Sequence, residues 1–192
     1  MKIRNFIIIG VLLTLVGCTA VQPTSNTTFS SVPSYALVSS DIVPQNIQEF
    51  VIPFSKTSMI DPYIIYGIIK MESDFEPNAR AYSYYGLMQL SLPAARSIDS
   101  NVSERDLFIP KINVHIGILY FQTLLTQFNN NNMLAIAAYN AGSQNVATWL
   151  QNNPNLNLSG IPYKSTRNYI QGIIDFYALC KKNELPPSSE TQ

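Results

Sequence analysis

Apolar side chains recur at helical spacing through most of the chain after residue 41. In segment 44–56 they share one helical face, and in segment 61–73 four isoleucines form a second stripe. The same spacing predicts three further helices, at 112–128, 132–139 and 166–180. No alternating run is long enough for an extended strand, although residues 77–87 leave room for a small hairpin. The pattern therefore predicts an all-α domain, or at most a mainly helical α+β domain.

Two local signals place helix boundaries within this pattern. Asp61 followed by Pro62 is a typical helix start, with the aspartate as N-cap and the proline in the first turn. Asn129, Asn130 and Asn131, the first three of four consecutive asparagines, separate two predicted helices, as expected for a turn. Both boundaries follow from residue chemistry alone.

The N-terminus has the pattern of a secretory signal peptide. Lys2 and Arg4 precede an apolar run at 6–16, which is shorter than the ~20 residues that a membrane-spanning helix needs. The run ends in Leu-Val-Gly-Cys at 15–18, which resembles the bacterial lipobox, where a peptidase cuts before the cysteine and the cysteine is lipidated. The alternative is that Cys18 is an ordinary residue just after a signal peptide. We expect a signal peptide at 1–17 and a lipid anchor on Cys18.

The rest of the chain divides into three parts. Segment 18–40 is rich in Ser, Thr, Pro and Asn and predicts a flexible tether that begins at the lipidated cysteine. Segment 41–182 carries the helical pattern, and its length of about 140 residues suits one hydrophobic core. Segment 183–192 is polar and Pro-rich, so we expect a disordered tail.

Composition excludes several classes of function. The chain has 12 basic and 12 acidic residues, so it lacks the basic stripe of a nucleic-acid-binding protein. If Cys18 is lipidated, Cys180 has no partner for a disulfide. The one histidine, His115, has no metal-binding neighbours in the sequence, and no phosphate-binding glycine loop occurs. We therefore expect no metal and no cofactor.

Glu72 is the first candidate for catalytic chemistry. It lies three and four residues after Ile69 and Ile68, so on a helix its carboxyl group continues the isoleucine stripe. Burial raises the pKa of a carboxyl group, and a protonated acid near neutral pH is what cleavage of a glycosidic bond requires. On periodicity alone, an exposed glutamate at a fraying helix end is the commoner case, because structural charges outnumber catalytic ones.

Four sequence motifs, in order along the chain, favour a catalytic Glu72 over an exposed structural one. The first joins Glu72-Ser-Asp-Phe-Glu-Pro-Asn-Ala to Gly86-Leu-Met-Gln-Leu, and the others are Asn113-x-x-x-Gly-x-x-Tyr120, Ala137-Ala-Tyr-Asn-Ala-Gly142 and Ile161-Pro-Tyr with Thr166-Arg and Tyr169. Together they resemble the motifs of the family 1 lytic transglycosylases, which have a goose-lysozyme-like helical fold with a substrate groove. The resemblance covers about 61–174, nearly the whole domain.

The resemblance implies a role for each matching residue. Glu72 would be the single catalytic acid/base, and seven residues would bind substrate: Ser73, Gly86, Met88, Gln89, Tyr139, Asn140 and Tyr169. It places Tyr169 near the catalytic acid, and it makes Tyr139 and Asn140 donors to a sugar N-acetyl group. Ordinary structural roles remain as alternatives: Gly86 as a loop glycine, Met88 as a core residue, Gln89 as a surface residue, Tyr139 and Asn140 as part of a helix C-cap, and Tyr169 as core packing.

The chain departs from the family pattern in two places. The loop between Glu72 and Gly86 is one residue shorter than usual, and Ala81 stands where the family has a serine; the nearest serine is Ser83. Ser165 stands where the family has a glutamate before Thr-Arg. These departures put a serine contact and the support of Tyr169 in question, but they leave the acid in place.

The family mechanism implies a lyase reaction without a cofactor. One carboxylate cleaves the bond between N-acetylmuramic acid and N-acetylglucosamine and produces 1,6-anhydromuramic acid. The partners expected are peptidoglycan strands and, through the lipid, a membrane, but no nucleic acid. Thr19 is not the aspartate that retains lipoproteins at an inner membrane, so we expect the outer membrane of a two-membrane cell envelope, facing the periplasm.

Two alternatives stay open. One is a lysozyme-type hydrolase on the same fold, and the other is a weakly active peptidoglycan-binding lipoprotein. The sequence leaves open whether cleavage starts at chain ends or within strands. It also leaves open whether the role is wall turnover, division or assembly of a secretion system.

Overall fold

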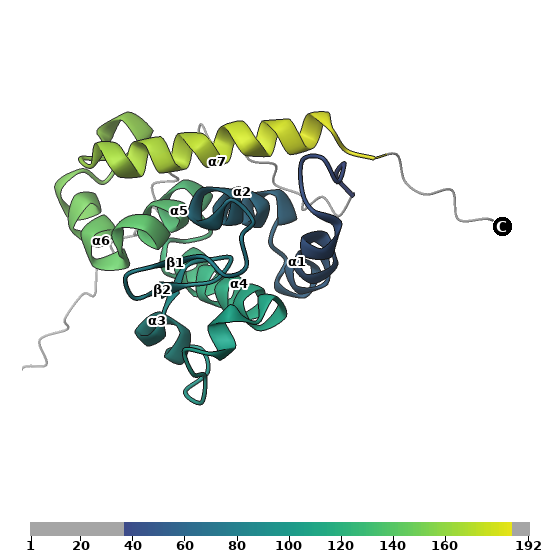
Figure 1. Cartoon of the computed structure of the whole chain (residues 1–192). Helices are drawn as coiled ribbons and strands as arrows, with labels where there is room; N and C mark the ends of the chain where they lie inside the picture. Colours follow the sequence, from purple (N-terminus) through teal and green to yellow (C-terminus); the bar gives the residue numbers. More distant parts are fainter. Residues whose placement is uncertain (1–36, 186–192) are drawn as a thin grey trace, which may run out of the picture.

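The computed structural model describes residues 37–185 and is mainly helical (Figure 1). Within that range the elements are α1 (Gln45–Ser58), α2 (Pro62–Ser73), β1 (Arg80–Ala81), β2 (Tyr84–Tyr85), β3 (Leu90–Ser91), α3 (Leu92–Arg96), η1 (Asp106–Phe108), α4 (Pro110–Gln127), α5 (Asn132–Ala141), α6 (Ser143–Asn152), η2 (Leu158–Gly160) and α7 (Lys164–Lys182). The predicted signal peptide, Cys18 and nearly all of the predicted tether and tail lie outside the described residues.

The helical prediction is confirmed, with differences at particular elements. α1, α2, α4, α5 and α7 lie at the predicted positions, and the Asn-rich turn has positive φ at Asn129 and Asn130. The small hairpin is part of a three-stranded antiparallel sheet in the order β1-β2-β3. The pattern missed α3, which is short, and α6, a mostly polar helix that buries only Val146 and Trp149.

Helix α2 forms the centre of the core. Asp61 caps it by accepting a hydrogen bond from the backbone N–H of Tyr63 at 3.0 Å, and Pro62 occupies its first turn. The helix ends where Asp74 takes a left-handed conformation. Its stripe is completely buried, with exposures of 0–1% for Ile64, Ile65, Ile68 and Ile69.

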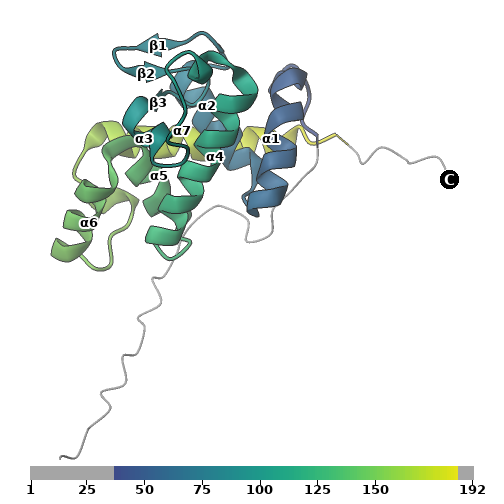
Figure 2. The same cartoon turned by 90° about the horizontal axis from the view of Figure 1, so that it is seen from below.

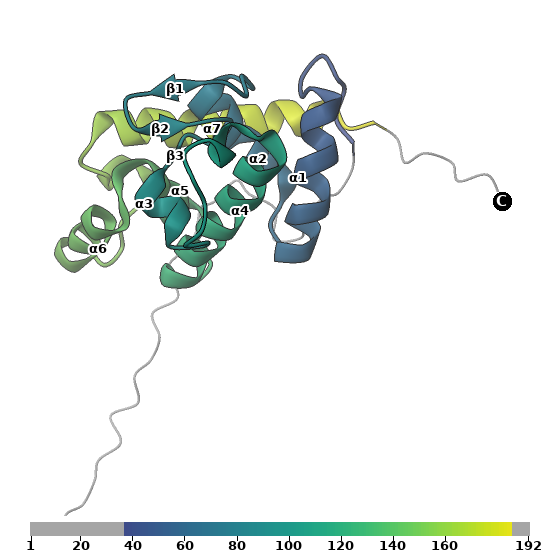
Figure 3. The ribbon, with the colours of Figure 1, turned by 60° about the horizontal axis from the view of Figure 1, so that its bottom comes forward.

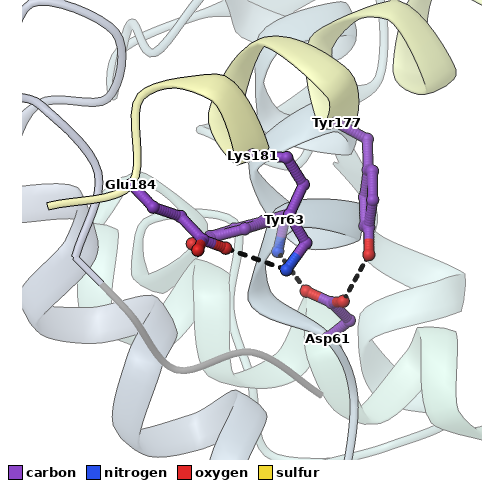
Figure 4. A network of polar contacts seen from close by, with 5 residues as sticks. All are labelled: Asp61, Tyr63, Tyr177, Lys181 and Glu184. Atoms are coloured by element: carbon purple, nitrogen blue, oxygen red, sulfur yellow. Dashed lines mark hydrogen bonds and ion pairs between the residues drawn. The ribbon is translucent and has the colours of Figure 1, made fainter. Parts of the chain in front are cut away.

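Helices α2 and α7 pack side by side and antiparallel. At one end the Tyr177 hydroxyl of α7 donates to Asp61 Oδ2 at 2.8 Å, and Lys181 lies over the ring of Tyr63 at 4.9 Å (Figure 4). In the middle a Cβ on Gly67 would lie 2.8 Å from Ile173 Cγ2, so only glycine permits this close approach. The start of α7 therefore lies beside the end of α2.

The loop between β2 and β3 is tied to α4 by one buried amide. Asn113 is 0% exposed; its Nδ2 donates to the carbonyls of Tyr85 and Leu107, and its Oδ1 accepts from the N–H of Met88, each at 2.8 Å. Gly86, with φ of 72°, approaches Asn113 so closely that a Cβ there would collide with it. The sheet is thus fixed to the helical body by hydrogen bonds as well as packing.

The two ends of the described chain lie beside each other. Val38 forms an antiparallel bridge with Glu184, and the Leu185 N–H donates to the Leu37 carbonyl at 2.8 Å. The buried side chain of Gln48 on α1 bonds to both backbone groups of Val38. These contacts include residues just outside 41–182, and they lie near α1 and away from α6 (Figure 2). None of the helices within 37–185 is both long and apolar enough to cross a membrane.

Candidate active site

A cavity of about 510 Å³ is lined by residues from the end of α2, the sheet, α3, α4 and the end of α5. Figure 3 shows how these elements are arranged. This is the size of a small-molecule site. Its lining combines one carboxyl group with aromatic rings, amides and small residues. The lining residues are Glu72, Ala81, Tyr84, Gln89, Leu90, Ser91, Ala94, Tyr120, Tyr139, Asn140, Ala141 and Gly142.

Glu72 lies in the last turn of α2 and enters the cavity from the buried stripe. Burial raises the pKa of its carboxyl group from 4.5 to about 7, and the hydrogen bond from Tyr169 partly opposes this shift. Its place at a helix C-terminus works in the same direction as burial, because the helix dipole disfavours a negative charge there. Near neutral pH both protonation states are populated, as a group that gives and takes a proton requires.

Tyr169 supports Glu72 from α7. Its hydroxyl donates to Glu72 Oε1 at 2.7 Å, and the ring is buried. Burial and the neighbouring Glu72 carboxylate raise the Tyr169 pKa well above its usual value, so the phenol stays a hydrogen-bond donor. Within residues 37–185 the other carboxyl oxygen, Oε2, has no hydrogen-bond partner, which leaves it available to a ligand.

Glu72 is the only acidic residue that lines this cavity in the described part of the chain. The acidic residues nearest in sequence, Asp74 and Glu76, are exposed, and Glu104 pairs with Arg80 at 3.3 Å. A mechanism with two carboxylates, as most glycosidases use, therefore has no second group here.

Tyr139 closes the inner end of the cavity, but it is not the free donor that the family resemblance implied. Its hydroxyl donates to the Met88 carbonyl at 2.8 Å. Burial, and then the charge of Glu72, raises its pKa well above the usual value, so it remains protonated. The hydroxyl lone pairs are what Tyr139 can offer a ligand. Met88 itself is 0% exposed and its sulfur packs against Gly117, so its side chain does not line the cavity.

Asn140 has its amide orientation set by a neighbouring hydroxyl. Thr166, which is 1% exposed at the start of α7, donates through Oγ1 to Asn140 Oδ1 at 2.9 Å. Among the described residues Nδ2 of Asn140 has no partner. Asn140 therefore presents an N–H donor to the cavity.

Gln89 has the opposite arrangement. Its Nε2 donates to the carbonyls of Ala79 and Gly86, at 2.9 and 2.8 Å, which uses both amide hydrogens. The side chain is 8% exposed, lines the cavity and keeps its carbonyl oxygen as an acceptor. The cavity thus holds one amide donor and one amide acceptor.

Two of the expected site residues shape the loop rather than the cavity. Ser73 Oγ donates to the Leu87 carbonyl at 2.7 Å and so pins the loop to α2. Gly86 faces Asn113 and η1. Neither lines the cavity.

The sequence reasoning missed several residues that the structure brings to the site. Tyr84, Tyr120, Ser91 and Ala94 line the cavity. Tyr120 lay in a recognised motif, and so did Asn113 and Thr166, which hold other site residues in place. The motif gave their positions, but the hydrogen bonds that define their roles join residues far apart in sequence.

The structure shows where the two departures from the family pattern lie. Ala81 lines the cavity, so the position of the family serine presents only a methyl group. The shortened loop closes with a two-residue turn, Tyr82 and Ser83, between β1 and β2. Ser165 is exposed in the first turn of α7, one residue before Thr166.

Comparison with known proteins identifies relatives of this chain. Residues 50–159 match the family described as Transglycosylase SLT domain. The soluble lytic murein transglycosylase of Escherichia coli strain K12 is 32% identical over 124 residues, which is 58% of this chain and 19% of the relative. The enzyme of that name in Salmonella typhimurium strain LT2 is 32% identical over 143 residues, covering 66% of this chain and 22% of its own length.

Solved structures give the same result. An inactive glutamate-to-glutamine mutant of the lytic transglycosylase Slt from Pseudomonas aeruginosa aligns with a TM-score of 0.64 and 27% identity, over 72% of this chain and 25% of that one. The 70 kDa soluble lytic transglycosylase of Escherichia coli aligns with a TM-score of 0.64 and 27% identity, over 71% and 24%.

The chain spans only about a fifth to a quarter of the length of these relatives. The family match nevertheless covers more than half of this chain and every residue that lines the cavity. The helical fold with its small sheet is shared as well. On this evidence, the chain belongs to the family of SLT-domain transglycosylases.

Proposed function

We propose that this chain is a lytic transglycosylase that cleaves the glycan strands of peptidoglycan between N-acetylmuramic acid and N-acetylglucosamine. The observation that carries the proposal is the single carboxyl group of Glu72, with a pKa of about 7, in a cavity that holds no other acidic residue among those described. One group in that state can act as acid and then as base within one reaction cycle.

In the first step protonated Glu72 gives its proton, from Oε2, to the glycosidic oxygen. The bond from C1 of N-acetylmuramic acid to that oxygen breaks, and N-acetylglucosamine leaves with a free hydroxyl group. The substrate's own N-acetyl group stabilises the electron-poor C1. Tyr169 then stabilises the carboxylate that remains, through the 2.7 Å hydrogen bond to Oε1.

In the second step Glu72, now ionised, takes the proton from the C6 hydroxyl of the same sugar. The C6 oxygen bonds to C1, which closes the 1,6-anhydro ring and returns Glu72 to its protonated form. No water enters the products and no cofactor is used. The reaction therefore needs only one carboxyl group, whereas most glycosidases hydrolyse their substrates with two.

The two amides suit an N-acetylated sugar. An acetamido group carries one N–H donor and one carbonyl acceptor. Asn140 offers an N–H and Gln89 offers a carbonyl oxygen, each fixed by its own hydrogen bonds. This pairing supports an N-acetylated sugar over one that carries only hydroxyl groups.

We also propose that the protein acts in the cell envelope, held by a lipid on Cys18 at the outer membrane and facing the periplasm. The support for the envelope is the substrate named in its relatives, which are bacterial murein transglycosylases. The support for the anchor is the signal peptide and lipobox pattern in 1–18.

The test is a digest of purified sacculi followed by mass analysis of the released muropeptides. We expect products that end in 1,6-anhydromuramic acid, lighter by one water than those with a reducing end. Reducing ends would assign the chain to the hydrolases instead. Binding of sacculi without release of products would assign it to the peptidoglycan-binding lipoproteins.

A further inference from the structure

The turn between β1 and β2 contains a residue that the fold itself does not favour. Ala81 pairs with Tyr84, so Tyr82 and Ser83 form a two-residue turn, and the β1–β2 hairpin lies at the outer edge of the fold (Figures 2 and 3). Tyr82 has φ of 54°, and such turns favour Gly, Asn or Asp at a positive φ. A bulky residue in this conformation costs backbone energy that glycine would not.

Nothing in the packing offsets this cost. The side chain of Tyr82 is 96% exposed, the highest exposure among the large apolar and aromatic residues exposed in the described chain. It makes no ring contact or hydrogen bond with residues 37–185. A strained backbone that presents an aromatic ring to solvent points to a role in binding rather than in folding.

The turn lies next to the cavity of Glu72. Ala81 and Tyr84 are directly paired, so their side chains share one face of the hairpin, and both line the cavity. Tyr84 is 50% exposed. This face of the hairpin is therefore one wall of the cavity, and the turn that holds Tyr82 lies at the end of that wall.

Three tyrosines line the cavity between Glu72 and the hairpin turn: Tyr139 on α5, Tyr120 on α4 and Tyr84 on β2. Tyr139, beside Glu72, packs edge-on against Tyr120 with ring centroids 5.7 Å apart. Tyr120 and Tyr84 both line the cavity, and Tyr84 is near enough to raise the pKa of Tyr120, after the larger effect of burial. Tyr82 precedes Tyr84 by two residues and lies in the turn.

We propose that Tyr82 and Tyr84 form an outer saccharide site, on which a sugar ring of the glycan strand stacks where the strand leaves the cavity. The inference rests on the proposed function, because it takes the peptidoglycan strand as ligand. A polymer longer than a 510 Å³ cavity has to cross its rim, and the apolar face of a hexose ring packs well on an exposed aromatic ring. The site lies in the loop where this chain is shorter than its family.

The test measures affinity against ligand length. Oligomers of two to six β-1,4-linked N-acetylglucosamine units are titrated calorimetrically into the full-length Glu72→Gln protein, with and without Tyr82→Gly. Glycine fits φ of 54° better than tyrosine, so the melting temperature should not fall. We expect Tyr82→Gly to weaken binding of the longest oligomers by about 2- to 10-fold, and the loss to grow with length.

Two further variants separate stacking from other effects. Tyr82→Phe keeps the ring and should bind long oligomers as tightly as tyrosine does; a loss equal to that of Tyr82→Gly would overturn stacking. Met59→Gly is the matched control, because Met59 is also exposed with φ of 57° but caps α1 outside the cavity. It should leave the length dependence unchanged, and an equal loss there would also overturn the proposal.

The outcome for this site can be read apart from the proposed function. If sacculi yield anhydro products but affinity does not rise with oligomer length, or Tyr82→Gly binds all lengths like its parent, the outer site is refuted and the activity stands. If no anhydro products appear but the length-dependent loss is found, the proposed reaction fails and the saccharide site stands.

Discussion

The hydroxyl group of Tyr169 lies 2.7 Å from Oε1 of Glu72, although the two residues are 97 positions apart in the chain. The contact exists because α2 and α7 run antiparallel, so the end of one helix meets the start of the other. It gives Glu72 two unlike oxygens. Oε1 is bound to the phenol, and Oε2 is left for the substrate.

Removing this hydroxyl should shift the pH dependence of catalysis. The hydrogen bond stabilises the carboxylate and lowers the Glu72 pKa, so Tyr169→Phe should raise that pKa above about 7. The free enzyme needs protonated Glu72, so kcat/KM should fall as pH rises through this pKa. In the variant that fall should lie at higher pH, with a lower maximal rate. A pH–rate profile checks this, and a fall at lower pH would contradict it.

Replacing the acid itself should abolish activity. Glu72→Gln keeps the shape of the side chain but cannot supply a proton. General acid–base steps contribute about 10²–10⁴-fold, and here one residue serves both steps, so the loss should lie at the upper end or beyond. Binding of glycan should survive, as measured by co-sedimentation with sacculi. A folded Glu72→Gln protein with full activity would refute the mechanism.

The same variant should change how stability depends on pH. Between pH 4.5 and about 7 folded Glu72 keeps a proton that the unfolded chain releases, so wild-type stability falls as pH rises through this window. Glu72→Gln should therefore match the wild type near pH 4 and exceed it above pH 7, by up to about 3 kcal/mol. Thermal or denaturant unfolding at both pH values measures the difference. An equal gain at pH 4 would show that burial does not raise the pKa.

Thr166 should matter through Asn140. Thr166→Val removes the hydroxyl that holds Asn140 Oδ1 but keeps the side-chain shape, so the amide is free to turn its carbonyl toward the ligand. We expect weaker substrate binding, with KM raised about 10-fold, because one hydrogen bond between neutral groups, from Asn140 to the substrate, is lost or reversed in direction. The control is Thr148→Val, which loses a hydroxyl bond to the Gln144 carbonyl on α6. Equal effects of both variants would rule out this role.

Ser165 tests the missing family carboxylate. Ser165→Glu adds a negative charge in the first turn of α7, where the helix dipole favours it, next to the residue that holds Asn140. If the carboxylate matters, turnover should rise or the pH optimum should shift. An unchanged pH–rate profile would show that the position is structurally neutral in this chain.

The lipid anchor is tested by Cys18→Ser. Without the thiol no lipid can be attached, so the protein should be released from membranes or keep its signal peptide uncleaved. Fractionation and the mass of the product distinguish these results. A Cys18→Ser protein that remains with membranes at mature size would refute the lipoprotein interpretation.

Much of the fold could be predicted from the sequence, because its signals are local and repeated. The isoleucine stripe of α2, the cap at Asp61 and the Asn-rich turn each lie within a few residues, and the structure confirms all three. Helix α6 was not predicted, because most of Ser143–Asn152 is polar and its two buried residues form too short an apolar stripe. The period of α2 put Glu72 in line with the isoleucine stripe, but only the surrounding motifs favoured a catalytic role over an exposed helix end.

The hydrogen bonds of the site could not be predicted in this way. In the sequence Asn113 is only one polar residue in an apolar helix. Its role depends on partners in two segments far from it in the chain, which only the structure shows. Thr166 and Asn140 are 26 residues apart, and the direction of the Asn140 amide depends on that contact. The hydrogen bond from the Tyr139 hydroxyl to the Met88 carbonyl could not be predicted for the same reason, because the two residues are 51 positions apart.

The bridge between Val38 and Glu184 brings the two ends of the described chain together at one end of the domain. Both chain exits lie together by the start of α2, and Glu72 lies at its other end, roughly 18 Å away for a helix of 12 residues. A lipid attached before Leu37 and any extension added after Leu185 would enter at the same end. A tether that reaches the domain at this end would not pass over the cavity, so the proposed anchor would leave the cavity open to the strand.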